Sequence, residues 1–206
     1  MIVHNVARVV HFDIKPENIL IDKTDTVKIA DFGISKMMNK EEEFKKVGGT
    51  RMFLPPETWK VKKFKGKPID IWAIGVTFYY LAFGYYPFSS VDPTQFNKTV
   101  ESTEVKFPAE ADPQYVDLLK RCLVKDPEAR ITLDEIFEHG WVTRSGQSPL
   151  EKCGIGEHIT VTRNEIEKAF TVRKIEVNMF AVTRVRTLLK SNRKITRTPE
   201  AAVGGE

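Results

Sequence analysis

The sequence contains few cysteines and no long apolar run. Only Cys122 and Cys153 occur among its 206 residues, which argues against a disulfide framework and fits a reducing compartment. No apolar stretch approaches the length of a membrane span, and the N-terminus shows no signal-peptide pattern. We therefore expect a cytoplasmic protein without a transmembrane segment, and the nucleus stays open as a second compartment.

The net charge of the chain is small, but the charged residues are unevenly distributed along the sequence. A net charge of +4 does not indicate a nucleic-acid partner, and none is expected. With 41% hydrophobic and 29% charged residues, the composition is that of a globular protein with one sizeable core. The excess of basic residues lies near the C-terminus.

What the sequence does contain is a compact set of polar residues at its start. An acid, a lysine and an amide lie within residues 10–18 (VHFDIKPEN), and a second acid, Asp31, opens the tripeptide DFG. Phosphoryl transfer to a hydroxyl needs a group that orients the hydroxyl, charge neutralisation and ligands for Mg²⁺. Asp13 can accept the hydroxyl proton, and Lys15 can neutralise charge on the phosphate. Asn18 and Asp31 supply the hard oxygen ligands that Mg²⁺ prefers.

The surrounding residues predict the local structure that this chemistry needs. Short β-branched runs at residues 19–22 and 27–30 flank turn-forming residues, which predicts a hairpin that brings Asn18 close to Asp31. Residues 68–83 are apolar nearly all round and predict a buried helix. Further helices are expected at about 113–124 and 132–138, whereas residues 34–56 are expected to be irregular.

The two motifs resemble the catalytic loop and the Mg²⁺ loop of the protein kinases. The resemblance covers about residues 4–142 and implies a kinase domain at residues 1–142. The fold class is then α+β, a protein-kinase-like fold with a mainly helical C-lobe and a short β-hairpin. It implies ATP and Mg²⁺ as cofactors and phosphoryl transfer to Ser/Thr of a protein substrate, such as a downstream kinase. Lys15 together with Thr50 resembles the serine/threonine class, although Thr50 can equally be a turn residue after two glycines.

Three further residues match the kinase pattern and suggest structural support. Glu57 and Arg130 resemble the pair that closes the substrate-binding segment, and a buried acid and arginine need each other as partners. Asp70, on the apolar helix, can brace the catalytic loop by accepting its backbone N–H groups. As an alternative, Asp70 can be the N-cap of that helix. Glu17 is either surface charge or, as in some basophilic kinases, a contact for a basic substrate residue.

A closer resemblance links the chain to the calcium/calmodulin-dependent protein kinase kinases. It rests on residues 66–77 (GKPIDIWAIGVT), on residues 141–143 and on residues 159–166. Phe12 replaces the arginine that usually precedes the catalytic aspartate in the protein kinases that the chain resembles. A phosphate on the activation segment then has no obvious receptor, which suggests another route of activation, such as calmodulin.

The sequence lacks a counterpart of the kinase N-lobe, with its Gly-rich loop, strand lysine and partner glutamate. We therefore expect a C-lobe with the N-lobe absent, and an isolated chain that neither binds ATP tightly nor transfers phosphate. The competing hypothesis is a catalytically inactive, kinase-like binding module that docks substrates or calmodulin.

The C-terminal third is expected to be regulatory. Residues 143–161 are predicted to be a linker, residues 162–197 a basic tail and residues 198–206 a disordered end. Between residues 177 and 197 of this tail, apolar residues interleave with six basic ones and no acid, a pattern that fits a calmodulin groove or an anionic membrane surface. Phe180 and Leu189 are the expected calmodulin anchors. The alternative is a solvated basic helix packed on the catalytic domain.

Overall fold

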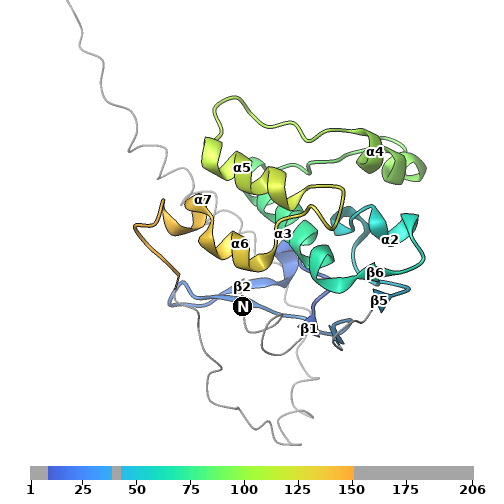
Figure 1. The fold of residues 1–206 in the computed structure, drawn as a ribbon, viewed down its shortest axis with the longest axis horizontal. Coiled ribbons are helices and arrows are strands. Elements are labelled where there is room, and N and C mark those ends of the chain that lie inside the picture. Colours follow the sequence, from blue (N-terminus) through green and yellow to red (C-terminus); the bar gives the residue numbers. More distant parts are fainter. Residues whose placement is uncertain (1–8, 39–42, 151–206) are drawn as a thin grey trace, which may run out of the picture. The chain divides into compact units, whose positions relative to one another are not determined.

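The computed structural model describes residues 9–38 and 43–150, and Figure 1 shows their arrangement. The strands are β1 (Val9–Val10), β2 (Ile19–Ile21), β3 (Val27–Ile29), β4 (Lys36–Met37), β5 (Glu43–Phe44) and β6 (Phe64–Lys65). The α-helices are α2 (Glu57–Lys60), α3 (Gly66–Phe83), α4 (Phe96–Ser102), α5 (Pro113–Cys122), α6 (Leu133–Glu138) and α7 (Gly140–Thr143). Three single 3₁₀ turns are η1 (Pro16–Asn18), η2 (Arg51–Phe53) and η3 (Pro93–Gln95). The predicted α+β class is confirmed.

Helix α3 is the centre of the core, as its all-round apolar sequence predicts. Each of the four buried apolar clusters in the described residues contains at least one of its side chains, among them Trp72, Ile69, Ile71 and Tyr79. A helix that is apolar on every side is stable only when it is covered on every side. It ends where Gly84 adopts a left-handed φ of 84° and donates its N–H to the Tyr80 carbonyl.

Helices α5 and α6 pack beside α3, and both begin with a capping side chain. Asp112 accepts hydrogen bonds from two N–H groups of the first turn of α5, and Thr132 forms a capping box with Glu135 at α6. Gly75 allows α3 and α5 to approach closely, because a Cβ there would lie 2.8 Å from Cys122 Cβ. The two helices predicted from the sequence are confirmed, with α5 ending two residues earlier than expected.

The strands form three separate two-stranded antiparallel sheets, β1–β4, β2–β3 and β5–β6. The predicted hairpin is confirmed as β2–β3, in which Ile19 pairs with Ile29 and Ile21 with Val27. The expectation that residues 34–56 are irregular was wrong in part, because β4, β5 and η2 lie there. Pairings of two residues each leave no periodic signal in the sequence. In the part of the chain that the structure describes, no helix is long and apolar enough to cross a membrane.

Candidate active site

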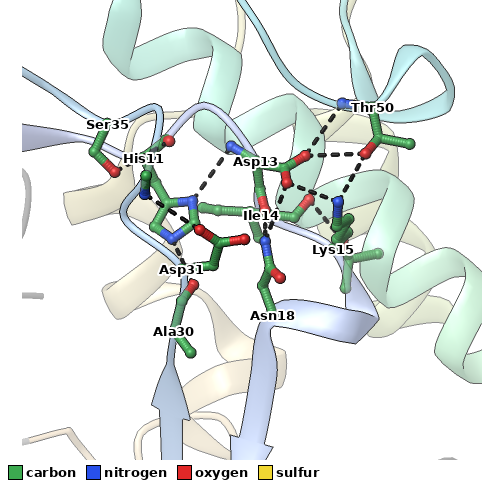
Figure 2. A network of polar contacts seen from close by, with 11 residues as sticks. His11, Asp13, Ile14, Lys15, Asn18, Ala30, Asp31, Ser35 and Thr50 are labelled. Atoms are coloured by element: carbon green, nitrogen blue, oxygen red, sulfur yellow. Dashed lines mark hydrogen bonds and ion pairs between the residues drawn. The ribbon is translucent and has the colours of Figure 1, made fainter. Parts of the chain in front are cut away.

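The carboxylate of Asp13 lies on the loop that joins β1 to β2 and is the centre of a polar network (Figure 2). Its Oδ2 lies 2.7 Å from Lys15 Nζ, and its Oδ1 accepts hydrogen bonds from Thr50 N (3.1 Å) and Thr50 Oγ1 (3.0 Å). Lys15 Nζ also donates to Thr50 Oγ1 at 2.9 Å, which closes a ring of three side chains. Asn18 Nδ2 donates to the Asp13 carbonyl at 2.7 Å and to Oδ2 at 3.2 Å. The sequence-predicted residues Asp13, Lys15, Asn18 and Thr50 therefore converge.

The surroundings of Asp13 keep it ionised. Burial opposes ionisation, but the hydrogen bonds from Lys15 and Thr50 and the charge of Lys15 outweigh it, so the pKa of Asp13 lies below the usual aspartate value. An ionised carboxylate is an acceptor with several lone pairs. It can orient an incoming hydroxyl while Lys15 remains beside it as a positive charge.

Asp70 holds the backbone of the loop that carries Asp13. Its carboxylate is fully buried and accepts hydrogen bonds from His11 N at 2.8 Å and Phe12 N at 2.9 Å. The alternative of an N-cap is wrong, because α3 begins at Gly66 and its N-cap position is Lys65. Phe12 has a positive φ of 66°, and the two hydrogen bonds to Asp70 help to hold this strained conformation.

His11 is a site residue that the sequence analysis did not single out. Its ring is buried, and Nδ1 accepts a hydrogen bond from Asp13 N at 3.3 Å. Nε2, which therefore carries the proton, donates to the Ala30 carbonyl at 3.0 Å. The ring also packs edge-on against Phe32, with centroids 4.7 Å apart. His11 thus connects the loop that carries Asp13 to the end of β3, and its only signal in the sequence is its place two residues before Asp13.

The hairpin β2–β3 brings the two expected magnesium ligands to one end. Ala30 N donates to the Asn18 carbonyl at 2.8 Å, so the residue before Asp31 lies directly against Asn18. Asp31 is exposed, has a φ of 63°, and its Oδ1 accepts a hydrogen bond from Gly33 N at 3.2 Å. One amide oxygen and one accessible carboxylate fit Mg²⁺, which takes few protein ligands and keeps water or phosphate oxygens.

Thr50 reaches Asp13 because the backbone before it lies directly on the loop that carries Asp13. Gly49 has a φ of 103°, and a Cβ at this position would lie 2.4 Å from the Phe12 carbonyl oxygen. Only glycine fits such a close approach. The contacts of Thr50 with both Asp13 and Lys15 favour its predicted link to the loop over a simple turn residue.

Glu57 and Arg130 form a buried bidentate pair. Arg130 Nη1 lies 2.7 Å from Glu57 Oε1 and Nη2 lies 3.0 Å from Oε2. Arg130 also donates to the carbonyls of Pro68 (2.7 Å) and Val124 (2.9 Å), and its guanidinium lies 5.1 Å from the centre of the Trp72 ring. This pair connects the start of α2 to the loop before α6, as the sequence predicts.

The remaining predicted residues are less informative. Glu17 is exposed. Burial raises the pKa of Tyr86, and the neighbouring Tyr80 and the charge of Glu17 add smaller contributions in the same direction. The expected calmodulin anchors Phe180 and Leu189, the tail at 162–197 and the end at 198–206 lie outside the described residues.

Comparison with known proteins identifies the family. The protein kinase domain family matches residues 2–142. The chain is 36% identical over 205 residues to a calcium/calmodulin-dependent protein kinase kinase, cmkC, of Emericella nidulans, covering 96% of this chain and 40% of that protein. It is 36% identical over 149 residues to the serine/threonine-protein kinase ppk34 of Schizosaccharomyces pombe, covering 71% and 42%.

A plant relative gives the same result. Over 153 residues the chain is 36% identical to the serine/threonine-protein kinase GRIK1 of Arabidopsis thaliana, covering 73% of this chain and 37% of that protein. The chain thus spans about two fifths of the length of these curated relatives. With a family match over most of its length and relatives of one kind, the chain belongs to the serine/threonine protein kinase family.

Proposed function

We propose that this chain carries the catalytic loop of an active serine/threonine protein kinase, which transfers the γ-phosphoryl group of Mg·ATP to a protein hydroxyl. The observation that supports it most strongly is the ring formed by Asp13, Lys15 and Thr50, with all three contacts between 2.7 and 3.0 Å. A surface ion pair held by chance does not need a third side chain that contacts both of its members. Positioning and charge stabilisation are most of what phosphoryl transfer asks of a protein.

Each residue of the ring has a distinct role in this proposal. Asp13 orients the substrate hydroxyl and accepts its proton, which its ionised state permits. Lys15 stabilises the charge on the transferred phosphoryl group. Thr50 fixes the two side chains relative to each other and ties the substrate-binding segment to them. The Glu57–Arg130 pair anchors the far end of that segment.

The cofactors are proposed to be ATP and Mg²⁺. Asn18 and Asp31 would hold the metal ion, which when bound neutralises charge on the phosphates. We assign the described residues to the kinase C-lobe. The apolar side chains exposed around the hairpin fit a face that a nucleotide-binding lobe covers; they include Leu20, Val27, Ile29 and Phe32, which are 41–61% exposed.

A phosphotransfer assay on the chain joined to a kinase N-lobe tests the proposal. Labelled phosphate should reach a protein substrate, and Asp13→Asn and Asp31→Ala should each remove most of the activity. Asp22→Asn is the matched control, because Asp22 is a turn aspartate outside the network and its loss should leave the rate unchanged. Absence of transfer by the unmutated protein, with ATP bound, would favour the non-catalytic binding module.

The proposed substrate is another kinase, and the proposed regulator is calmodulin, both supported by the name of the Emericella nidulans relative. Six basic side chains and no acid lie between residues 177 and 197, so an acidic partner should be attracted. Titration of the full chain with Ca²⁺-calmodulin should show binding that Phe180→Ala plus Leu189→Ala weakens by at least about tenfold. Calcium-independent binding would leave only a nonspecific basic tail.

A further inference from the structure

An aromatic pair joins the catalytic loop to the segment that precedes Thr50. The rings of Phe12 and Phe44 meet edge-on, with centroids 5.0 Å apart and planes at 83°. Both side chains are nearly inaccessible, at 3% and 5% exposure. Val10, Phe64 and Ile69 complete the same buried cluster. The residue next to Asp13 therefore contributes its side chain to an apolar contact with residues far along the chain.

The same segment is poorly equipped to be ordered by phosphorylation. Between Phe32 and Thr50 the sequence contains two hydroxyl side chains, Ser35 and Thr50 itself. Ser35 Oγ donates to the His11 carbonyl at 3.3 Å, and Thr50 Oγ1 is part of the ring with Asp13 and Lys15. Ordering by phosphate needs an accessible hydroxyl and a basic receptor. Both hydroxyls are engaged with the catalytic loop, and the position beside Asp13 is apolar.

Phe12 contacts the segment from Phe44 to Thr50 near both of its ends. The backbone of Phe12 is held from one side by Asp70, and its carbonyl lies against Gly49 on the other. Its side chain holds Phe44, six residues before Thr50. Lys36 Nζ adds a cation–π contact, 5.6 Å from the centre of the Phe44 ring. The segment from Phe44 to Thr50 is thus attached to one short loop at both of its ends.

We propose that the Phe12–Phe44 contact orders residues 44–50 on the catalytic loop without phosphorylation, which makes Phe44 a positioning residue for Thr50 and Asp13. The alternative is that the pairing of β5 with β6, in which Phe44 lies opposite Phe64, is sufficient by itself. The ordering is a property of the fold. Its consequence for the rate of phosphoryl transfer rests on the proposed function.

Amide hydrogen exchange in the full 206-residue chain, without ATP, tests the proposal directly. Phe44→Ala should accelerate exchange at residues 45–50 by at least about tenfold and leave α5 unchanged. Phe44→Leu retains apolar volume and should stay within about threefold of the unmutated chain. Phe12→Ala should accelerate the same amides, and the double variant should exchange no faster than the faster single variant, because both remove one contact.

A matched control separates a local role from a general loss of stability. Phe88 is as buried as Phe12, at 3% exposure, but belongs to the cluster around Trp72. Phe88→Ala should accelerate exchange in α3 at least as much as at residues 45–50. Unchanged exchange at residues 45–50 in Phe44→Ala would overturn the proposal in favour of the β5–β6 pairing. Equal acceleration in α5 would overturn it too, by making Phe44 a general core residue.

The catalytic consequence is tested in the chain joined to a kinase N-lobe. Phe44→Ala should lower kcat while the KM for ATP stays unchanged. Phe44→Leu, which retains apolar volume, should keep kcat close to that of the unmutated protein. Phosphatase treatment should not change the activity of the unmutated protein. A loss of activity on phosphatase treatment would contradict phosphate-independent ordering. Failure of the unmutated protein to transfer phosphate would contradict the proposed function alone, because the exchange measurement does not depend on turnover.

Discussion

Two of the ion pairs in the described residues, Arg130–Glu57 and Lys15–Asp13, differ in how completely they are enclosed. The side chains of Arg130 and Glu57 are 0% and 4% exposed, and Arg130 has two further carbonyl acceptors within 3 Å. Lys15 and Asp13 are 21% and 12% exposed and share Thr50 as their common partner. The first pair is closed to any ligand. The second is accessible, so a substrate oxygen can enter among its members.

This difference assigns the two pairs to different tasks. A buried pair whose donors are satisfied from all sides fixes two segments of chain, but its loss is costly because one charge stays behind in the core. A partly exposed pair contributes little to folding, since water screens its charges. What the second pair can supply is a fixed orientation of groups around a reacting phosphate. Four measurements, in order of expected effect, can break or sharpen this comparison.

The largest effect is expected from removing one partner of the buried pair. Glu57→Ala leaves the Arg130 guanidinium without its charge partner, and the free energy of unfolding should fall by about 3–5 kcal/mol. Urea unfolding measures it. In the double variant Glu57→Gln plus Arg130→Met neither of the two positions carries a charge, so part of the loss should be recovered. A loss below about 1 kcal/mol in Glu57→Ala would show that this pair is no more structural than the one at Asp13.

The accessible pair should behave in the opposite way. In the chain joined to a kinase N-lobe, Asp13→Asn should reduce phosphoryl transfer by about 100-fold or more, the range expected for loss of a general base. The free energy of unfolding should change by only about 1 kcal/mol, because the pair is partly exposed. A stability loss as large as that of Glu57→Ala would remove the distinction between the two pairs.

The contrast also marks what could be predicted from the sequence. Asp13, Lys15, Asn18 and Thr50 were predictable because their chemistry is local and their spacing is fixed by one loop and one hairpin. Asp70 was predictable only as one of two alternatives, since its register in α3 depends on where the helix begins. His11 and the Phe12–Phe44 contact were not predicted. Their roles depend on which segments come into contact in the folded chain. Two-residue strands such as β5 leave no periodic sequence pattern from which that contact could be predicted.

The third measurement is the pH dependence of stability. The pKa of Asp13 is lower in the folded chain than its ordinary value of 3.8. Its ionised form therefore stabilises the fold above that value, and the contribution disappears as the pH falls through the lowered pKa. Urea unfolding of the unmutated chain and of Asp13→Asn between pH 2 and 6 should show a difference that shrinks on acidification below about pH 4. A stability difference that does not change with pH would mean that the partners of Asp13 do not lower its pKa.

The smallest effect is expected from Ser35, and it separates a hydroxyl that helps hold the chain from one that takes part in the site. Ser35 Oγ makes one long hydrogen bond, 3.3 Å, to the His11 carbonyl, whereas Thr50 Oγ1 contacts both Asp13 and Lys15. Ser35→Ala should therefore change phosphoryl transfer by about twofold at most, since one long hydrogen bond falls at the low end of the usual contribution, about 0.5 kcal/mol. Thr50→Val is the matched variant: it keeps the shape, removes the hydroxyl from the ring and should lower the rate by about tenfold.

If Ser35→Ala lowered the rate as much as Thr50→Val, Ser35 would be either a second member of the site or a phosphorylation site. The latter outcome would contradict ordering by Phe12 and Phe44, and mass spectrometry of the active protein would distinguish the two.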